Sequence, residues 1–131
     1  MKYLLDTNAF ILLNLDFNAL PLSYQRILTD GDNTFVLSPA TIWEMAIKVR
    51  LGKLSLSGIS LDALTGQLRL KLKIGLLPIK QNQLLDIARL PKVKDHGDPF
   101  DLLIIAQALA ENLPVLTSDE KFYLYGVNVV K

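Results

Sequence analysis

The chain has 131 residues, 50% of them hydrophobic, which is enough to bury one core. Its 14 basic and 13 acidic residues nearly cancel, which excludes a strongly basic surface over the whole molecule. The absence of cysteine excludes disulfides and thiolate metal sites, and a single histidine excludes a histidine-rich zinc site. A catalytic metal would therefore take oxygen ligands. We expect residues 1–131 to form one domain.

The N-terminal segment is apolar in places, but it lacks the features of a targeting sequence. Asp6 interrupts it early, and no small-residue cleavage site follows, so we predict no signal peptide. No uninterrupted apolar run approaches the roughly 18 residues needed to span a bilayer. The sequence thus predicts a soluble cytoplasmic protein that does not enter a membrane.

Short apolar runs alternate with segments of helical periodicity along the chain. Strands are expected at residues 2–5, 34–37, 75–79, 114–119 and 127–131. Helices are expected at residues 9–15, 21–28, 39–51, 60–72, 82–90 and 99–112, with a helical turn at 120–125. This alternation predicts an α/β domain with a mostly parallel sheet.

The middle helix has clear start and stop signals. Ser38 is expected as its N-cap, Pro39 as its first residue, and Gly52 just past its end. Apolar residues recur at helical spacing and predict one buried face. That face consists of Ile42, Met45, Ala46 and Val49.

Four acids fall where the loops of such a sheet gather. Asp6 follows the strand expected at 2–5, and Asp119 follows the strand "VLT". Glu44 lies inside the middle helix, and Asp101 lies in the first turn of the helix at 99–112. Ligands of parallel sheets bind outside the carboxyl ends of the strands, so these acids are expected to converge. Clustered carboxylates repel one another and raise each other's pKa, and a hard divalent cation relieves that repulsion.

Each acid also has an ordinary structural explanation. Asp6 is equally suited to capping the helix after it, and Asp119 to capping the turn at 120–125. Glu44 has the spacing for an exposed ion pair with Lys48, worth about 0.2 to 0.5 kcal/mol.

Asp98 and Asp101 compete for one role. Asp98 stands before Pro99, as an N-cap does, and Asp101 occupies the third helical position, where a reciprocal capping box places its acid. An acid in the first turn is also stabilised as the anion by the helix dipole, which a metal ligand requires. We therefore predict that Asp98 caps the helix and Asp101 faces the metal.

Three blocks of sequence resemble a known family. They are "LLDTNAFI", "SPATIWEMAIKVRLGKL" and "LPKVKDHGDPFDLLIIAQALAENLPVLTSDEKFYLYGV", and in this order and spacing they closely resemble PIN-domain ribonucleases, specifically VapC-type toxins. The resemblance extends from Lys2 to Val130. It implies a PIN-like three-layer α/β/α sandwich around a mostly parallel sheet. It also implies an acid quartet that binds Mg²⁺ or Mn²⁺: Asp6, Glu44, Asp101 and Asp119, with Asp98 as the competing third member.

The resemblance suggests supporting residues as well. Residues expected to orient the carboxylates or the waters of the metal are Thr7, Asn8, Thr117 and Asp98. Candidate RNA contacts are Lys48, Arg50, Lys53, Lys92, Lys94 and His96. For the threonines and Asn8 the alternative is turn and cap chemistry, and for each lysine it is a solvated surface. His96 has no evident partner in the sequence, so we expect substrate contact or no role. Family members often carry a basic residue where this chain has Leu102.

The resemblance implies a metal-dependent endoribonuclease that acts as the toxin of a type II toxin-antitoxin pair. Its expected partners are an RNA substrate, a cognate antitoxin that inhibits it, and a second copy of the chain in a homodimer. The alternative is a catalytically silent PIN-like module that binds RNA or protein. A phosphoryl-transfer domain of the haloacid-dehalogenase type is disfavoured, because Asn8 stands where it needs a second aspartate.

Overall fold

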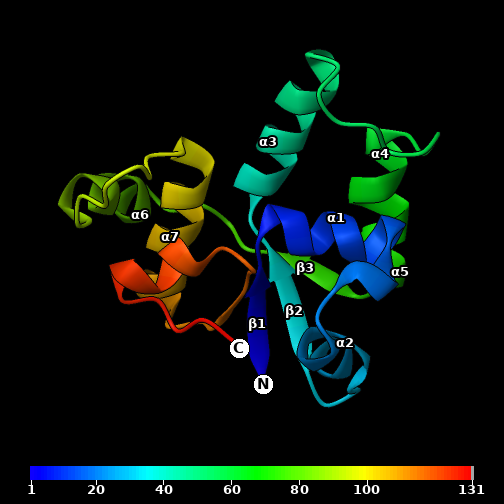
Figure 1. Ribbon diagram of the computed structural model, residues 1–131, viewed down its shortest axis with the longest axis horizontal. Helices are drawn as coiled ribbons and strands as arrows, with labels where there is room; N and C mark the ends of the chain where they lie inside the picture. Colours follow the sequence, from blue (N-terminus) through cyan, green and yellow to red (C-terminus); the bar gives the residue numbers. More distant parts are fainter. Residues whose placement is uncertain (131) are drawn as a thin grey trace.

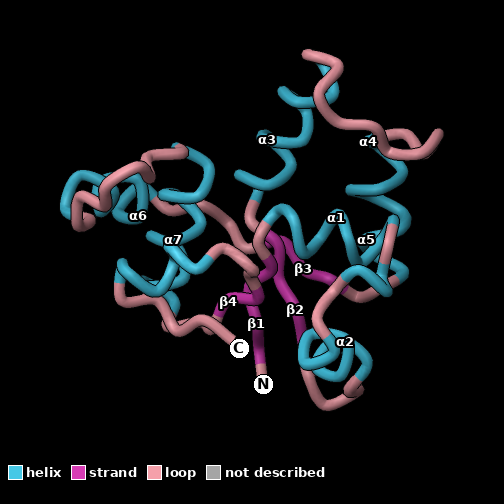
Figure 2. The backbone as a smooth tube through the Cα atoms, viewed as in Figure 1, coloured by secondary structure: helices cyan, strands magenta, loops and turns pink. Residues whose placement is uncertain are grey.

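The computed structural model describes residues 1–130, which fold around a four-stranded sheet. The strands are β1 (Lys2–Leu5), β2 (Thr34–Leu37), β3 (Ile74–Leu76) and β4 (Val115–Leu116). Their order is β3-β2-β1-β4, and every pair is parallel. The tube in Figure 2 shows the strands together at the centre of the molecule. The predicted parallel α/β architecture is confirmed.

Helices cover both faces of the sheet. The helical elements are α1 (Thr7–Leu15), η1 (Phe17–Ala19), α2 (Leu22–Thr29), α3 (Pro39–Arg50), α4 (Leu61–Ala63), η2 (Leu64–Leu68), α5 (Arg69–Lys71), α6 (Gln81–Asp86), η3 (Ile87–Arg89), α7 (Pro99–Glu111) and η4 (Glu120–Tyr125). Figure 1 shows α1, α2, α4 and α5 on one side of the sheet and α6 and α7 on the other. This is the predicted three-layer sandwich.

The strands build two cores because successive side chains of a strand point to opposite faces. Leu5 of β1 packs with Phe10 of α1 in one core. Leu4 packs with Ile104 of α7 in the other. All four side chains are fully buried. The sheet therefore fixes the position of its carboxyl edge relative to α1 and α7, whose first turns both lie there.

Helix α7 begins and ends where the sequence predicted. Asp98 caps it, Pro99 is its first residue, and Asn112 closes it in the left-handed conformation with φ of 52°. It is thirteen residues long. Across residues 1–130, no helix has the length and apolar character needed to cross a bilayer.

The predicted buried face of α3 is only partly buried. Met45 is fully buried, but Ala46 and Val49 are exposed, so that part of the prediction is wrong. The residues that α3 buries are instead Ala40, Thr41, Glu44 and Met45, and none lies beyond Met45. Figure 1 shows the reason: the second half of α3 extends past the edge of the sheet, where no layer covers it.

Two further predictions needed correction. The segment expected as one helix at 60–72 is helical from residue 61 to 71. Its middle, η2, is π-helical, with α4 before it and α5 after it. The edge strand expected at 127–131 is reduced to one bridge between Val129 and Val115, and Lys131 lies outside the described residues. Two backbone hydrogen bonds form this bridge, from the N–H of Val115 to Asn128 and from the N–H of Val130 to Val115. The carbonyl of Val130 accepts from the hydroxyl of Tyr24.

Tyr24 of α2 ties the end of β4 to the C-terminal segment. Its buried hydroxyl lies within hydrogen-bond distance of the carbonyl oxygens of Thr117 and Val130, the latter at 2.7 Å, and its single hydrogen is shared between them. We predict that Tyr24→Phe lowers the free energy of unfolding by about 1 to 3 kcal/mol, because it leaves buried carbonyls without their donor. Urea unfolding measures the loss. Tyr123→Phe, at a 58% exposed position, is the matched control and should change nothing.

Candidate active site

The strand order reverses between β1 and β4, so the chain leaves these neighbouring strands toward different layers. β1 leads into α1, and β4 leads into η4. In open parallel sheets, the crevice formed at such a reversal is the usual ligand site. A cleft of about 260 Å³ opens here. It is lined by Asp6, Thr7, Asn8, Ile11, Glu44, Lys48, Asp101, Ser118, Asp119 and Phe122, a set that includes all four predicted acids.

Asp6 both starts α1 and faces the cleft. One carboxylate oxygen accepts a hydrogen bond from the backbone N–H of Ala9 at 2.7 Å, which is the expected N-cap contact. The other accepts from the hydroxyl of Thr117. The residue is only 6% exposed. The two explanations given for Asp6 are thus compatible, because one side chain serves both.

Glu44 is buried rather than exposed. Thr7 donates from Oγ1 to Glu44 Oε1 at 2.7 Å, and Lys48 Nζ lies 2.6 Å from Oε2. Thr41, which the sequence did not single out, hydrogen-bonds Thr7 at 3.1 Å. The ion pair foreseen with Lys48 is present, but its acid is 5% exposed, so the surface explanation for Glu44 is wrong.

Asp98 caps α7 as predicted, and Asp101 lines the cleft, where its role as a metal ligand stays a prediction. Asp98 Oδ1 accepts from the backbone N–H groups of Phe100 at 2.9 Å and Asp101 at 3.1 Å. In a capping box the side chain of Asp101 would accept from the backbone N–H of Asp98. Here the carboxylate of Asp101 contacts His96 instead. Asp101 lines the cleft, whereas Asp98 lies outside its lining.

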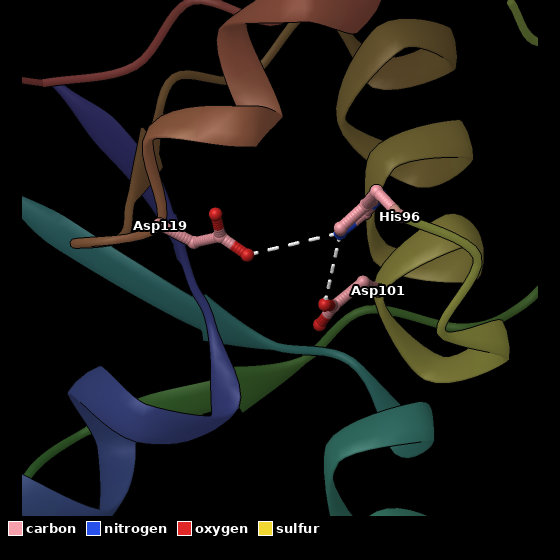
Figure 3. Close-up of side chains that lie close together, drawn as sticks. All are labelled: His96, Asp101 and Asp119. Atoms are coloured by element: carbon pink, nitrogen blue, oxygen red, sulfur yellow. Dashed lines mark hydrogen bonds and ion pairs between the residues drawn. The ribbon is translucent and has the colours of Figure 1, made fainter. Parts of the chain in front are cut away.

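His96 stands between two acids. Its Nε2 lies 3.3 Å from Asp101 Oδ2 and 3.7 Å from Asp119 Oδ2, and Figure 3 shows both carboxylates pointing toward it. Its Nδ1 lies 2.6 Å from the hydroxyl of Tyr125. The expectation that His96 has no partner is wrong. Sequence reasoning missed this network, since only the spacing of His96 and Asp101 within one loop-to-helix stretch hinted at it.

The tightest cluster of possible ligands combines two of the four predicted acids with His96, which was predicted only as an RNA contact. Within residues 1–130, only His96, Asp101 and Asp119 form a group of three whose ligand atoms lie within 4.8 Å of one another. Asp6 and Glu44 line the cleft together with Asp101 and Asp119, and each accepts a hydrogen bond from a threonine hydroxyl. The structure thus brings the four acids to one cleft without yet bringing them to one point.

The other predicted residues fall at varying distances from the acids. Asn8 lines the cleft with an exposed side chain, and Asp119 caps η4 through the backbone N–H of Lys121 at 2.9 Å. Among the candidate RNA contacts, Lys48 lines the cleft. The others outside it are exposed: Arg50, Lys53, Lys92 and Lys94. Ser118 lines the cleft and was not predicted.

Burial and mutual repulsion act on the carboxyls of the cleft. Burial is the main cause that raises the pKa of Asp6 to about 6, helped by the charges of Asp119 and Glu44 and opposed by its hydrogen bonds. Burial is also the main cause that raises the pKa of Asp101 to about 7, with the charges of Asp98 and Glu44 adding to it and His96 opposing. Ionising both therefore costs free energy in the metal-free protein.

The donor set suits a hard cation. All four predicted ligands are carboxylates, and Mg²⁺ and Mn²⁺ prefer oxygen ligands with open positions for water or phosphate. The raised pKa values of Asp6 and Asp101 show that the cleft lacks enough positive charge to compensate its acids. Lys48 supplies part of it. A divalent ion would supply the remainder, so the residues present fit such an ion.

The parallel sheet between two helical layers and the acid-lined cleft at its carboxyl edge place the protein among α/β domains whose ligand site lies at the ends of the strands. The family model of the PIN domain matches residues 3–128. The chain therefore belongs to the PIN domain family. No curated protein gave a significant match.

Solved structures share the fold at low sequence identity. VapBC2 from Rickettsia felis, bound to a DNA fragment from its promoter, aligns with a TM-score of 0.65 at 19% identity, covering 99% of this chain and 98% of the other. FitAcB from Neisseria gonorrhoeae aligns with a TM-score of 0.62 at 24% identity, covering 100% and 97%. VapBC-5 from Mycobacterium tuberculosis, a member of a family of toxin-antitoxin systems, aligns with a TM-score of 0.55 at 23% identity, covering 99% and 98%.

The raised pKa values predict how stability depends on pH. Asp6 and Asp101 bind a proton more tightly in the folded state than in the unfolded state, where the ordinary value is 3.8. Stability of the metal-free protein should therefore fall, by up to about 6 kcal/mol, as pH rises from 4 to about 7.5. Denaturant unfolding in EDTA measures it.

Asp6→Asn tests whether the carboxyl of Asp6 causes this pH dependence. Asparagine also caps helices, so the variant removes the titrating group and keeps the cap of α1. This variant should remove the part of the pH dependence that Asp6 contributes and keep the part that Asp101 contributes. A wild-type protein whose stability rises through the same pH range would contradict this account of the cleft.

Proposed function

We propose that this chain is a metal-dependent endoribonuclease, the toxin of a type II toxin-antitoxin pair. The observation that carries the proposal is the cleft where Asp6, Glu44, Asp101 and Asp119 converge in a chain of the PIN domain family. Gathering four acids in one partly buried cleft costs stability, so a selected function must compensate for the cost.

The acids would hold one or two Mg²⁺ or Mn²⁺ ions. When bound, such an ion lowers the pKa of a water, orients the phosphodiester and neutralises charge on the leaving oxygen. Thr117 and Thr7 keep Asp6 and Glu44 aligned through their hydroxyls. Asn8 and Ser118, exposed at the mouth of the cleft, are placed to contact the substrate or waters.

Basic residues lie on α3 and in the loop before α7, the segments next to Glu44 and Asp101. Lys48 lines the cleft, with Arg50 and Lys53 farther along α3, and Lys92 and Lys94 lie in the loop before α7. Exposed basic side chains of this kind bind the phosphate backbone, and affinity then falls with salt. They would position an RNA strand without specifying its sequence, which requires other contacts.

The toxin assignment rests on the structural neighbours, which are described as VapBC and FitAB assemblies. By analogy we propose that a cognate antitoxin inhibits the cleft, that the chain forms a homodimer, and that it acts on RNA in the cytoplasm. The alternative, a silent module that only binds RNA or protein, would not need all four acids.

Cleavage of a labelled structured RNA with Mg²⁺, Mn²⁺ or EDTA tests the enzymatic claim. Wild type should cleave only with the metal. Asp6→Asn and Asp101→Asn should each lower the rate by more than the roughly 10- to 100-fold lost when a residue that only orients a ligand is changed. Asp98→Asn should keep most activity, since asparagine also caps the helix.

Asp32→Asn, at an exposed turn, is the matched control and should match wild type. Folded protein that cleaves no RNA of a broad panel under any metal would overturn the nuclease proposal. Loss of activity in Asp98→Asn but not in Asp101→Asn would reassign the third ligand.

The toxin claim has its own test. Induced expression in a bacterial host should arrest growth, and Asp6→Asn should abolish the arrest. A small reading frame beside the gene, co-expressed, should restore growth and co-purify with the chain. An active nuclease that leaves growth unchanged would contradict the toxin role while retaining the enzyme.

A further inference from the structure

His96 lies behind the cleft, where it contacts acids from two separate elements. Its side chain is 6% exposed and does not line the cleft. Its Nε2 faces Asp101, in the first turn of α7, and Asp119, the cap of η4 (Figure 3). It is the single histidine of the chain. A buried ring aimed between two acids indicates a function in their arrangement.

The hydrogen bonds define the state of the neutral ring. In the ionised state that a metal ligand requires, the carboxylate of Asp101 only accepts, so the tautomer that suits it carries the hydrogen on Nε2, the nitrogen facing Asp101. Nδ1 is then the acceptor, and the hydroxyl of Tyr125, 2.6 Å away, is the donor. Burial, followed by the charges of Asp101 and Asp119, raises the pKa of Tyr125, which keeps this hydroxyl protonated. The phenol thus selects the tautomer that the acids require.

The surrounding loop holds the ring in place from several directions. Lys121 Nζ of η4 donates to the carbonyl of Asp95 at 2.9 Å, and the backbone N–H of His96 donates to Val93 at 3.2 Å. Asp95 has φ of 59°, a conformation that costs free energy for a non-glycine residue. The ring also packs edge-on against Phe122. The loop thereby joins α7 to η4 through His96.

Like charges on Asp101 and Asp119 would drive these carboxylates apart. The N–H of His96 lies near one oxygen of each, so it attracts both and opposes their separation. The ligand atoms of the three residues lie within 4.8 Å of one another. Opposite oxygen ligands of Mg²⁺ are about 4 Å apart, so little movement would be needed to bind the ion.

We propose that His96, oriented by Tyr125, is a positioning residue that holds Asp101 and Asp119 at the separation a divalent cation requires. This inference rests on the proposed metal-dependent function. It assigns the chain's one histidine to the metal site as a partner of its ligands rather than as an RNA contact. Partners of this kind typically change metal affinity by about 10- to 100-fold.

Manganese binding to the purified protein is the first test, measured by the electron paramagnetic resonance signal of free Mn²⁺. His96→Ala should weaken affinity about 10- to 100-fold. His96→Gln, whose amide N–H can replace Nε2–H, should recover most of the loss, and Tyr125→Phe should lose less than His96→Ala. Tyr123→Phe, at an exposed position of the same element, is the matched control and should bind as wild type does.

Nitrogen-15 NMR of the ring is the second test and needs no variant, because the single histidine gives unambiguous signals. The metal-free protein should show the tautomer protonated at Nε2, and Mg²⁺ should leave that proton in place. Loss of the Nε2 proton on Mg²⁺ binding would make His96 a direct ligand and overturn the positioning role. A tautomer protonated at Nδ1 would also overturn it.

These outcomes separate the inference from the proposed function. Equal Mn²⁺ affinity in wild type and a folded His96→Ala overturns the inference and leaves the nuclease proposal intact. Affinity that depends on His96 in a protein that cleaves no RNA overturns the nuclease proposal and supports the inference. Wild type that binds no Mn²⁺ overturns both.

Discussion

The burial of like-charged carboxylates at the carboxyl edge of the sheet is the constraint on which the site depends. Asp6 and Glu44 are 6% and 5% exposed, and Asp6 carries a raised pKa because water is excluded from it. Buried charge is tolerated only where hydrogen bonds or counter-charges compensate it. Here two threonine hydroxyls and Lys48 compensate it in part. The deficit that remains is the physical reason why we propose that the cleft binds a cation.

The fold holds two of these acids in place because they also cap helical elements. Asp6 and Asp119 each cap the helical element that follows their strand, so one carboxylate oxygen is fixed while the other faces a partner. Asp98 takes the cap of α7 and leaves Asp101 free to face the cleft. Since the caps contribute to stability, the local backbone orients the site before any ligand arrives.

Sequence reasoning located what is encoded locally. Strand ends, an N-cap before Pro99 and the parallel sheet follow from short-range patterns, and these placed Asp6, Asp101 and Asp119 on the correct edge. Contacts between segments far apart in the sequence could not be predicted from these short-range patterns. The bond of His96 to Tyr125 joins residues 29 positions apart, and the exposure of Val49 depends on where the other layers end. Periodicity identifies an apolar face but not what covers it.

The central claim is that the four carboxylates form one site for a hard divalent cation. Anomalous diffraction from crystals grown with Mn²⁺ tests it most directly, because the scattering locates the ion without assumptions about its ligands. The account predicts a manganese peak in the cleft, in contact with Asp6 and Asp101 and within reach of Glu44 and Asp119. Saturating Mn²⁺ with no peak in that cleft, or a peak bound elsewhere only, would contradict it.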